Sequence, residues 1–286
     1  AQGASAPTLP ESFDVREAWP ECAASISKPR NQGNCGSCWA FAAVEALEDR
    51  HCIHSHGKYA PTLSAQSLIG CDAHDGGCGG GFLDNAWRFL QLRGTQEESC
   101  VPYEHCPEPL LPNCSIGQTH IDDFVETTPS PHGPEPPRSP SPPPPPSPPP
   151  TPPPPEAHSN CSFCEDGAPS RLVRASSAYA VAAAGDAEGM QREIQAHGPI
   201  SVGFFVYSDF AQYKSGVYQR SAYAQGPIGG HAVKLIGWGV DAGVPYWTAV
   251  NSWSPGWGDQ GFFRIRRGTN ECGIENTPAA GLPAPP

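Results

Sequence analysis

The chemistry that this sequence can perform centres on the thiol of Cys38, which lies in a run from Asn31 to Phe41. Apolar residues follow Cys38 at intervals of three or four as far as Asp49, which predicts an amphipathic helix that starts at Cys38. A thiol attacks as the thiolate, and both a helix N-terminus and a cationic imidazole favour that form. The pattern therefore predicts a nucleophilic cysteine with a lowered pKa.

Three other side chains could complete a site of nucleophilic catalysis. His231 comes just before an apolar, strand-like run and is a candidate base. Asn251 follows a second such run, and its amide oxygen could fix the imidazole tautomer, with Trp253 shielding that bond from water. Gln32, six residues before Cys38, carries an NH₂ group suited to binding an oxyanion. The combination predicts a Cys–His–Asn site.

The run Cys35-Gly36-Ser37-Cys38-Trp39, with His231 and Asn251 in their own motifs, resembles the papain family of cysteine proteases and, within it, the cathepsin B type. The resemblance covers about residues 9–282 apart from one insertion, and further matching stretches are residues 9–20, 206–210, 214–218 and 257–263. It implies that Cys38 is the nucleophile, His231 the acid and base, Asn251 the orienting residue and Gln32 the oxyanion donor, without a metal or other cofactor.

The expected fold is α+β, with two domains as in papain. A helical half, about residues 9–125, precedes a strand-rich, barrel-like half, about residues 165–282, with the active-site cleft between them and the chain ends free to cross over. Helices are expected near residues 64–69, 83–90 and 188–197, and strands near 200–206, 232–237, 246–250 and 261–265.

The resemblance also implies a set of substrate-binding residues: Gly80, Gly81, Phe82, Leu83, Gly203, Ala232, Trp253 and Thr277. Residues 76–81 are too rich in glycine for regular structure and would pair with the substrate backbone, although a flexible turn is the alternative. Thr277 stands where the family has an acidic residue at the base of the pocket for the second residue before the scissile bond. The other pocket residues are apolar or small, so we expect a hydrophobic preference there.

The cathepsin B type removes dipeptides from C-termini with two adjacent histidines in an occluding loop. The corresponding residues 106–114 keep two cysteines and contain no histidine, and Glu108 would repel a carboxylate. We therefore expect an endopeptidase with weak or no dipeptidyl carboxypeptidase activity.

Twelve cysteines indicate an oxidising compartment. The resemblance implies five disulfides, which leave Cys38 and Cys272 free: Cys22–Cys52, Cys35–Cys78, Cys71–Cys161, Cys100–Cys164 and Cys106–Cys114. Two other interpretations lack their usual context: a redox pair of Cys35 and Cys38 without a βαβ unit, and half a zinc site at Cys161 and Cys164 without a nearby second half. The histidine-rich residues 51–56 are expected to be the solvated end of the Cys38 helix.

Residues 129–155 contain 18 of the 36 prolines and form neither helix nor sheet, because proline lacks the N–H group. We expect an insertion in polyproline II conformation that projects from the fold. It could bind a proline-recognising module or carry O-linked glycans. A tolerated solvent-exposed insertion is the simpler alternative, since long loops cost little to close.

A net charge of −12 argues against nucleic-acid binding, and no apolar run approaches the length of a membrane span. We expect a monomer of the lysosome, the vacuole or the extracellular space, whose signal and propeptide are removed or omitted. Protein and peptide substrates, its own propeptide and cystatin-like inhibitors are the partners that the resemblance implies. A non-catalytic scaffold presenting the proline-rich loop is the alternative function, and a thiol–disulfide oxidoreductase comes third.

Overall fold

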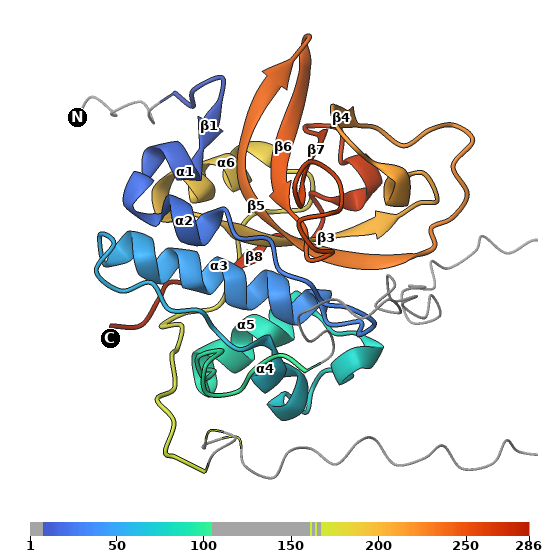
Figure 1. The fold of residues 1–286 in the computed structure, drawn as a ribbon. Helices are drawn as coiled ribbons and strands as arrows, with labels where there is room; N and C mark the ends of the chain where they lie inside the picture. The colour runs from blue at the N-terminus through green and yellow to red at the C-terminus, as the bar shows by residue number, and fades with distance from the viewer. Residues whose placement is uncertain (1–7, 105–160, 162–163, 165–166, 286) are drawn as a thin grey trace, which may run out of the picture.

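The computed structural model describes residues 8–104, 161, 164 and 167–285, and Figure 1 shows helices below and beside a curled β-sheet. The helices are α1 (Val15–Ala18), α2 (Ala23–Ile26), α3 (Cys38–His54), α4 (Ala65–Cys71), α5 (Leu83–Leu92) and α6 (Ala187–His197). The strands are β1 (Phe13–Asp14), β2 (Tyr179–Ala180), β3 (Ile200–Val206), β4 (Val217–Tyr218), β5 (Gly229–Asp241), β6 (Val244–Val250), β7 (Phe262–Arg266) and β8 (Ala279–Ala280). No described helix is long and apolar enough to cross a membrane.

One mixed sheet contains all eight described strands. Its order is β2-β8-β3-β5-β6-β7-β4, and β1 pairs with β5 beside this path. All pairs are antiparallel except β4 with β7, which is parallel. The predicted α+β fold class is confirmed. Three of the four expected strands, however, extend past the apolar runs that predicted them, and the expected irregular stretch at residues 76–81 contains a short 3-10 turn, Gly77–Gly79.

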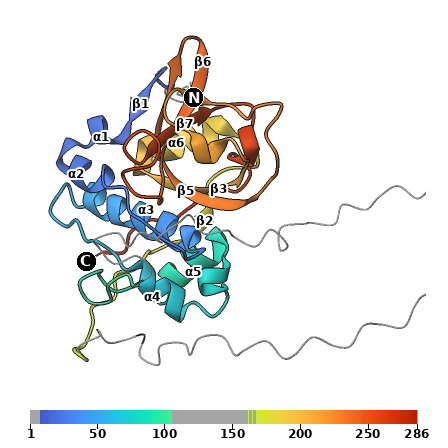
Figure 2. The ribbon, with the colours of Figure 1, turned by 45° about the vertical axis from the view of Figure 1, so that its right-hand side comes forward.

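Helix α3 lies between the sheet and the pair α4 and α5 (Figures 1 and 2). It packs against β3 and β5 on one side and against α4 and α5 on the other, so all of its residues from Cys38 to Ile53 are buried. The prediction of an amphipathic helix is therefore wrong, because both faces of α3 are covered. The expected solvated end is also wrong at His51, which is 4% exposed and lies within hydrogen-bonding distance of the Arg174 carbonyl.

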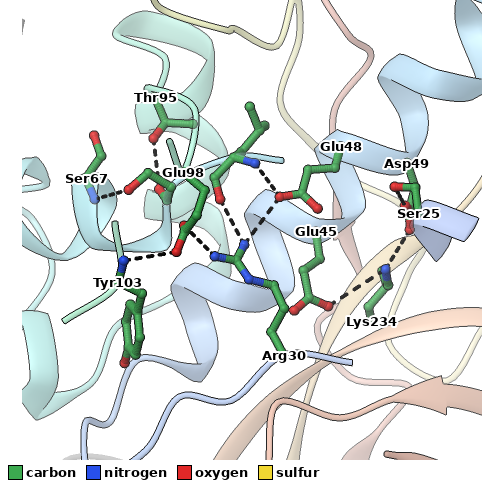
Figure 3. A network of polar contacts seen from close by, with 12 residues as sticks. Ser25, Arg30, Glu45, Glu48, Asp49, Ser67, Thr95, Glu98, Tyr103 and Lys234 are labelled. Carbon is green, nitrogen blue, oxygen red and sulfur yellow. Dashed lines mark hydrogen bonds and ion pairs between the residues drawn. The ribbon is translucent and has the colours of Figure 1, made fainter. Parts of the chain in front are cut away.

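Charged side chains are buried where α3 meets the sheet (Figure 3). The Nζ atom of Lys234 lies 2.6 Å from Oδ2 of Asp49 and 3.7 Å from Oε2 of Glu45. Further along, Arg30 lies 3.3 Å from Oε1 of Glu48, which also accepts the backbone N–H of residue 63. The second oxygen of Glu45, Oε1, has no hydrogen-bond partner. Burial raises the pKa of Glu45 to about 7 and that of Glu48 to about 8, although the nearby cations Lys234 and Arg30 oppose this shift.

We expect the free energy of unfolding to fall by ~2 kcal/mol as the pH rises from about 6.5 to about 8. The raised pKa values of Glu45 and Glu48 mean that the folded protein holds protons that the unfolded chain releases near pH 4.3. The stability that these bound protons contribute is fully present below about pH 4.3 and decreases as the pH rises. The loss is complete only above the folded pKa values of about 7 for Glu45 and about 8 for Glu48. Burial acts oppositely on His51 and His231, whose pKa values are lowered to about 4. Their contribution is lost only when the pH falls below about 6.5.

Thermal unfolding followed by circular dichroism at several pH values would measure this slope. Glu48→Gln should flatten it, whereas the control Glu188→Gln, at an exposed position, should leave it unchanged. A midpoint that stays constant or rises between pH 6.5 and 8 would show that these glutamates remain ionised in the folded protein.

Candidate active site

Cys38 is the first residue of α3, and its side chain is 6% exposed. The backbone N–H groups of Cys38 itself, Trp39 and Ala232 lower the pKa of this thiol and so favour the thiolate. Ala232 follows His231 on β5, so the packing of α3 against β5 brings the thiol next to the segment that carries the imidazole. The start of a helix and the start of a strand thus meet at the candidate nucleophile.

The hydrogen bonds of Asn251 define the tautomer of His231. Oδ1 of Asn251 accepts the backbone N–H of Ser252 at 2.8 Å, so this atom is the amide oxygen. The same oxygen lies 2.7 Å from Nε2 of His231, which must therefore carry the proton and donate it. Nδ1 is left as the basic nitrogen. Trp253 stacks on the imidazole with ring centroids 4.6 Å apart and covers one of its faces.

Burial acts against an isolated charge on either member of this pair. It raises the pKa of the Cys38 thiol, although the three N–H groups oppose it, and it lowers the pKa of His231 to about 4, although the bond to Asn251 opposes it. The expectation of a lowered thiol pKa is thus wrong for the thiol considered by itself. A thiolate beside an imidazolium carries no net charge, so burial penalises the two charges less when they form together.

Both polar atoms of the Gln32 side-chain amide are hydrogen-bonded, and the residue is 3% exposed. Nε2 donates to the carbonyl of Cys35 at 2.9 Å, and Oε1 accepts from the hydroxyl of Ser252 at 2.7 Å. Its backbone N–H also donates to the carbonyl of Ser252 at 2.9 Å. An amide nitrogen has two hydrogens, so the bond to Cys35 leaves one for another acceptor. Gln32 and Asn251 are joined through the single residue Ser252.

Several of the candidate substrate-binding residues lie close together in the structure. Gly203 pairs with Ala232 across β3 and β5, and a Cβ atom at Gly203 would lie 3.3 Å from Oγ1 of Thr277, so these three residues are neighbours. Leu83 and Ala232 share one apolar cluster with Cys38. Phe82 is 52% exposed.

The glycine-rich stretch packs its backbone on an aromatic ring. A Cβ atom at Gly81 would lie 2.6 Å from the Trp39 ring, so this position requires glycine. Gly80 has a φ of 116°, which also favours glycine, and nothing lies within 4 Å of where its Cβ would be. The backbone N–H of Gly36 donates to the carbonyl of Cys78 at 2.9 Å, which ties this stretch to the nucleophile's loop.

Four disulfides form among the described residues, and each coincides with a pair that the resemblance implies: Cys22–Cys52, Cys35–Cys78, Cys71–Cys161 and Cys100–Cys164. Cys38 and Cys272 are the described cysteines outside a disulfide. The bonds of Cys35, Cys161 and Cys164 remove both alternative interpretations, the redox pair and the zinc half-site. The pair Cys106–Cys114, Glu108 and the proline-rich residues 129–155 lie outside the described residues.

Two residues that sequence reasoning did not single out also contact this site. Ser252 lies between the recognised Asn251 and Trp253, so its position beside a candidate could have indicated a role. Tyr103 donates from its hydroxyl to the carbonyl of Gln32 at 2.7 Å. It lies 71 residues away along the chain, and no motif that we identified includes it.

Residues 9–282 match the family described as papain family cysteine protease. Cathepsin B-like cysteine proteinase 6 of Caenorhabditis elegans is 42% identical over 96% of this chain and 67% of its own length. Cathepsin B-like cysteine proteinase 4 of the same organism is 39% identical over 96% of this chain and 76% of its own length. Among solved structures, procathepsin B S9 from Trypanosoma congolense aligns with a TM-score of 0.74 and 31% identity, over 98% of this chain and 79% of that one.

Proposed function

Because the chain belongs to the papain family and is a cysteine protease, we propose that it hydrolyses peptide bonds with Cys38 as nucleophile, His231 as acid and base, Asn251 as the orienting residue and Gln32 as oxyanion donor. The observation that best supports this assignment is the 2.7 Å bond between His231 and Asn251. It puts the proton on Nε2 and leaves Nδ1 as the base, on a strand that packs against the helix that starts at Cys38.

The proposed reaction follows from these groups. The thiol proton moves to Nδ1 of His231, and the sulfur attacks the scissile carbonyl while the free N–H of Gln32 stabilises the oxyanion. His231 then protonates the leaving amine, which departs and leaves a thioester on Cys38. Water, deprotonated by His231, hydrolyses the thioester and restores the thiol. Hydrolysis of a peptidyl amide, lost after alkylation of the protein, tests this activity.

We propose a hydrophobic preference for the second residue before the cut, set by the small or apolar side chains around Thr277. A threonine cannot pair with a guanidinium, and a buried cation without a partner is costly. We expect kcat/KM for a Phe-Arg substrate to exceed that for Arg-Arg by on the order of tenfold, the ratio that ~1.4 kcal/mol of missing ion pairing gives. Thr277→Glu should reverse much of this difference.

The control for that variant is Thr277→Gln, which has nearly the shape of glutamate without its charge and should not improve Arg-Arg cleavage. A native preference for Arg-Arg would place another acidic residue in the pocket. A peptide-library cleavage profile also tests our proposal that internal cleavage dominates. Release of C-terminal dipeptides from free-acid peptides faster than internal cleavage would overturn that part.

We propose two halves bounded near residues 9–125 and 165–282, with residues 129–155 as an insertion. The relative from Trypanosoma congolense is described as a proform, and by analogy we propose that this enzyme is made with an inhibitory propeptide. We further propose a lysosomal, vacuolar or extracellular location, a monomer, and recognition by cystatin-like inhibitors.

A further inference from the structure

We propose that Tyr103 is a positioning residue of the oxyanion site, whose hydroxyl holds Gln32 in place through its backbone carbonyl. The proposal rests on the role assigned to Gln32 above. It adds a residue from a distant segment, shortly after Cys100, which is held by its disulfide to Cys164.

The direction of each hydrogen bond follows from the chemistry of the acceptors. The Tyr103 hydroxyl lies 2.7 Å from the Gln32 carbonyl, which can only accept, so the tyrosine donates its single proton there. The hydroxyl also lies 2.7 Å from Oγ of Ser37, which must therefore donate to the tyrosine. A chain thus runs from Ser37, the residue before the nucleophile, through Tyr103 to Gln32. Hydrogen bonds in such a chain polarise and strengthen one another.

Tyr103 is itself held in a fixed position. Its backbone N–H donates to Oε1 of Glu98 at 2.9 Å, and Oε2 of Glu98 binds the guanidinium of Arg30 at 2.5 Å (Figure 3). Its ring meets Phe41 of α3 edge to face, with centroids 4.8 Å apart. Burial raises the pKa of the Tyr103 hydroxyl, which keeps it protonated, and therefore a donor, at any pH near neutrality.

The other contacts of Gln32 leave a specific task for this hydroxyl. Ser252 holds the backbone N–H and Oε1 of Gln32, and Cys35 holds Nε2. At the carbonyl, the N–H of Cys35 is 3.4 Å away, much longer than the 2.7 Å bond from Tyr103. Loss of the Tyr103 hydroxyl would remove the short hydrogen bond to the backbone carbonyl of Gln32, and the peptide group at this carbonyl could then rotate. A small misplacement of a catalytic group can cost a large rate factor, up to about 100-fold for 1 Å.

The experiment is a double-mutant cycle of Tyr103→Phe and Gln32→Ala, with kcat and KM measured on a peptidyl amide. Tyr103→Phe keeps the ring and its contact with Phe41, so it should fold. We expect it to lower kcat about tenfold in the native background, with KM changed less than about twofold. In the Gln32→Ala background it should have no further effect. The matched control is Tyr213→Phe, which removes another hydroxyl that donates to a carbonyl at 2.7 Å and should leave kcat unchanged in both backgrounds.

The rate of alkylation by iodoacetamide separates two routes of action, since this reaction needs the thiolate and no oxyanion site. Tyr103→Phe should leave that rate within about twofold, because Tyr103 acts on Gln32 and not on the nucleophile. A slower alkylation, or an equal loss of kcat in both backgrounds, would overturn the proposal, as would an unchanged kcat in the single variant. An unchanged kcat in Gln32→Ala alone would instead contradict the proposed role of Gln32.

Discussion

Replacing Cys38 with alanine should abolish peptide-bond hydrolysis while the fold is retained. Without the sulfur no thioester can form, and the remaining groups can offer only binding and oxyanion stabilisation. Removal of the nucleophile in another protease class lowers kcat by on the order of 10⁶, and we expect a loss of similar size. Alanine is a good helix former, so it should be tolerated at the first position of α3, and the unfolding midpoint should change by only a few degrees.

The matched control is Cys272→Ser, which removes the other described cysteine that lies outside a disulfide. Burial, together with the neighbouring carboxylate of Glu271, raises the pKa of its thiol to about 12, so it is a poor nucleophile. Cys272→Ser should therefore keep nearly full kcat/KM. Substantial activity in Cys38→Ala would remove Cys38 from the mechanism.

Replacing Gln32 with alanine should lower kcat by about 10²–10³, with a much smaller change in KM, because an oxyanion donor acts mainly in the transition state. This is the usual loss for one such donor, worth ~2.7–4 kcal/mol. The measurement is a full Michaelis curve, with the unfolding midpoint determined on the same preparation, since Gln32 also bonds to Cys35 and Ser252.

Gln219→Ala serves as the control, because it removes the same type of side chain from an exposed position. A loss of kcat that the midpoint cannot explain, with Gln219→Ala unaffected, supports the assignment. If Gln32→Ala raised KM and left kcat intact, its side chain would contribute to substrate binding instead.

The sequence predicted individual elements well where one apolar run had clear ends. Strand β3 occupies Ile200–Val206, as expected, because its mostly apolar run begins directly after Gly198 and Pro199. The surroundings of an element were harder to predict. Helix α3 looked amphipathic because periodicity considers one helix by itself, whereas contacts with β5 on one side and α5 on the other bury its whole circumference.

The same limit applied to the candidate site. His231 and Asn251 could be singled out because each has its own short motif, and Gln32 because it lies in the run that contains Cys38. The structure then supplied the tautomer of His231 through Ser252. The effect of burial on the Cys38 thiol could not be predicted, since it depends on what packs over the helix end. Tyr103 could not be predicted either, because its contact with Gln32 joins segments that only the tertiary fold brings together.

The role of Cys38 as the nucleophile can be tested most directly by mapping, with mass spectrometry, the site that a peptidyl epoxide labels covalently while activity is followed. We expect one label per molecule, on the peptide that contains Cys38, with activity lost in proportion to labelling, and much slower labelling in His231→Ala. Labelling of Cys272 in proportion to the lost activity, with Cys38 unmodified, would contradict the claim that Cys38 is the nucleophile.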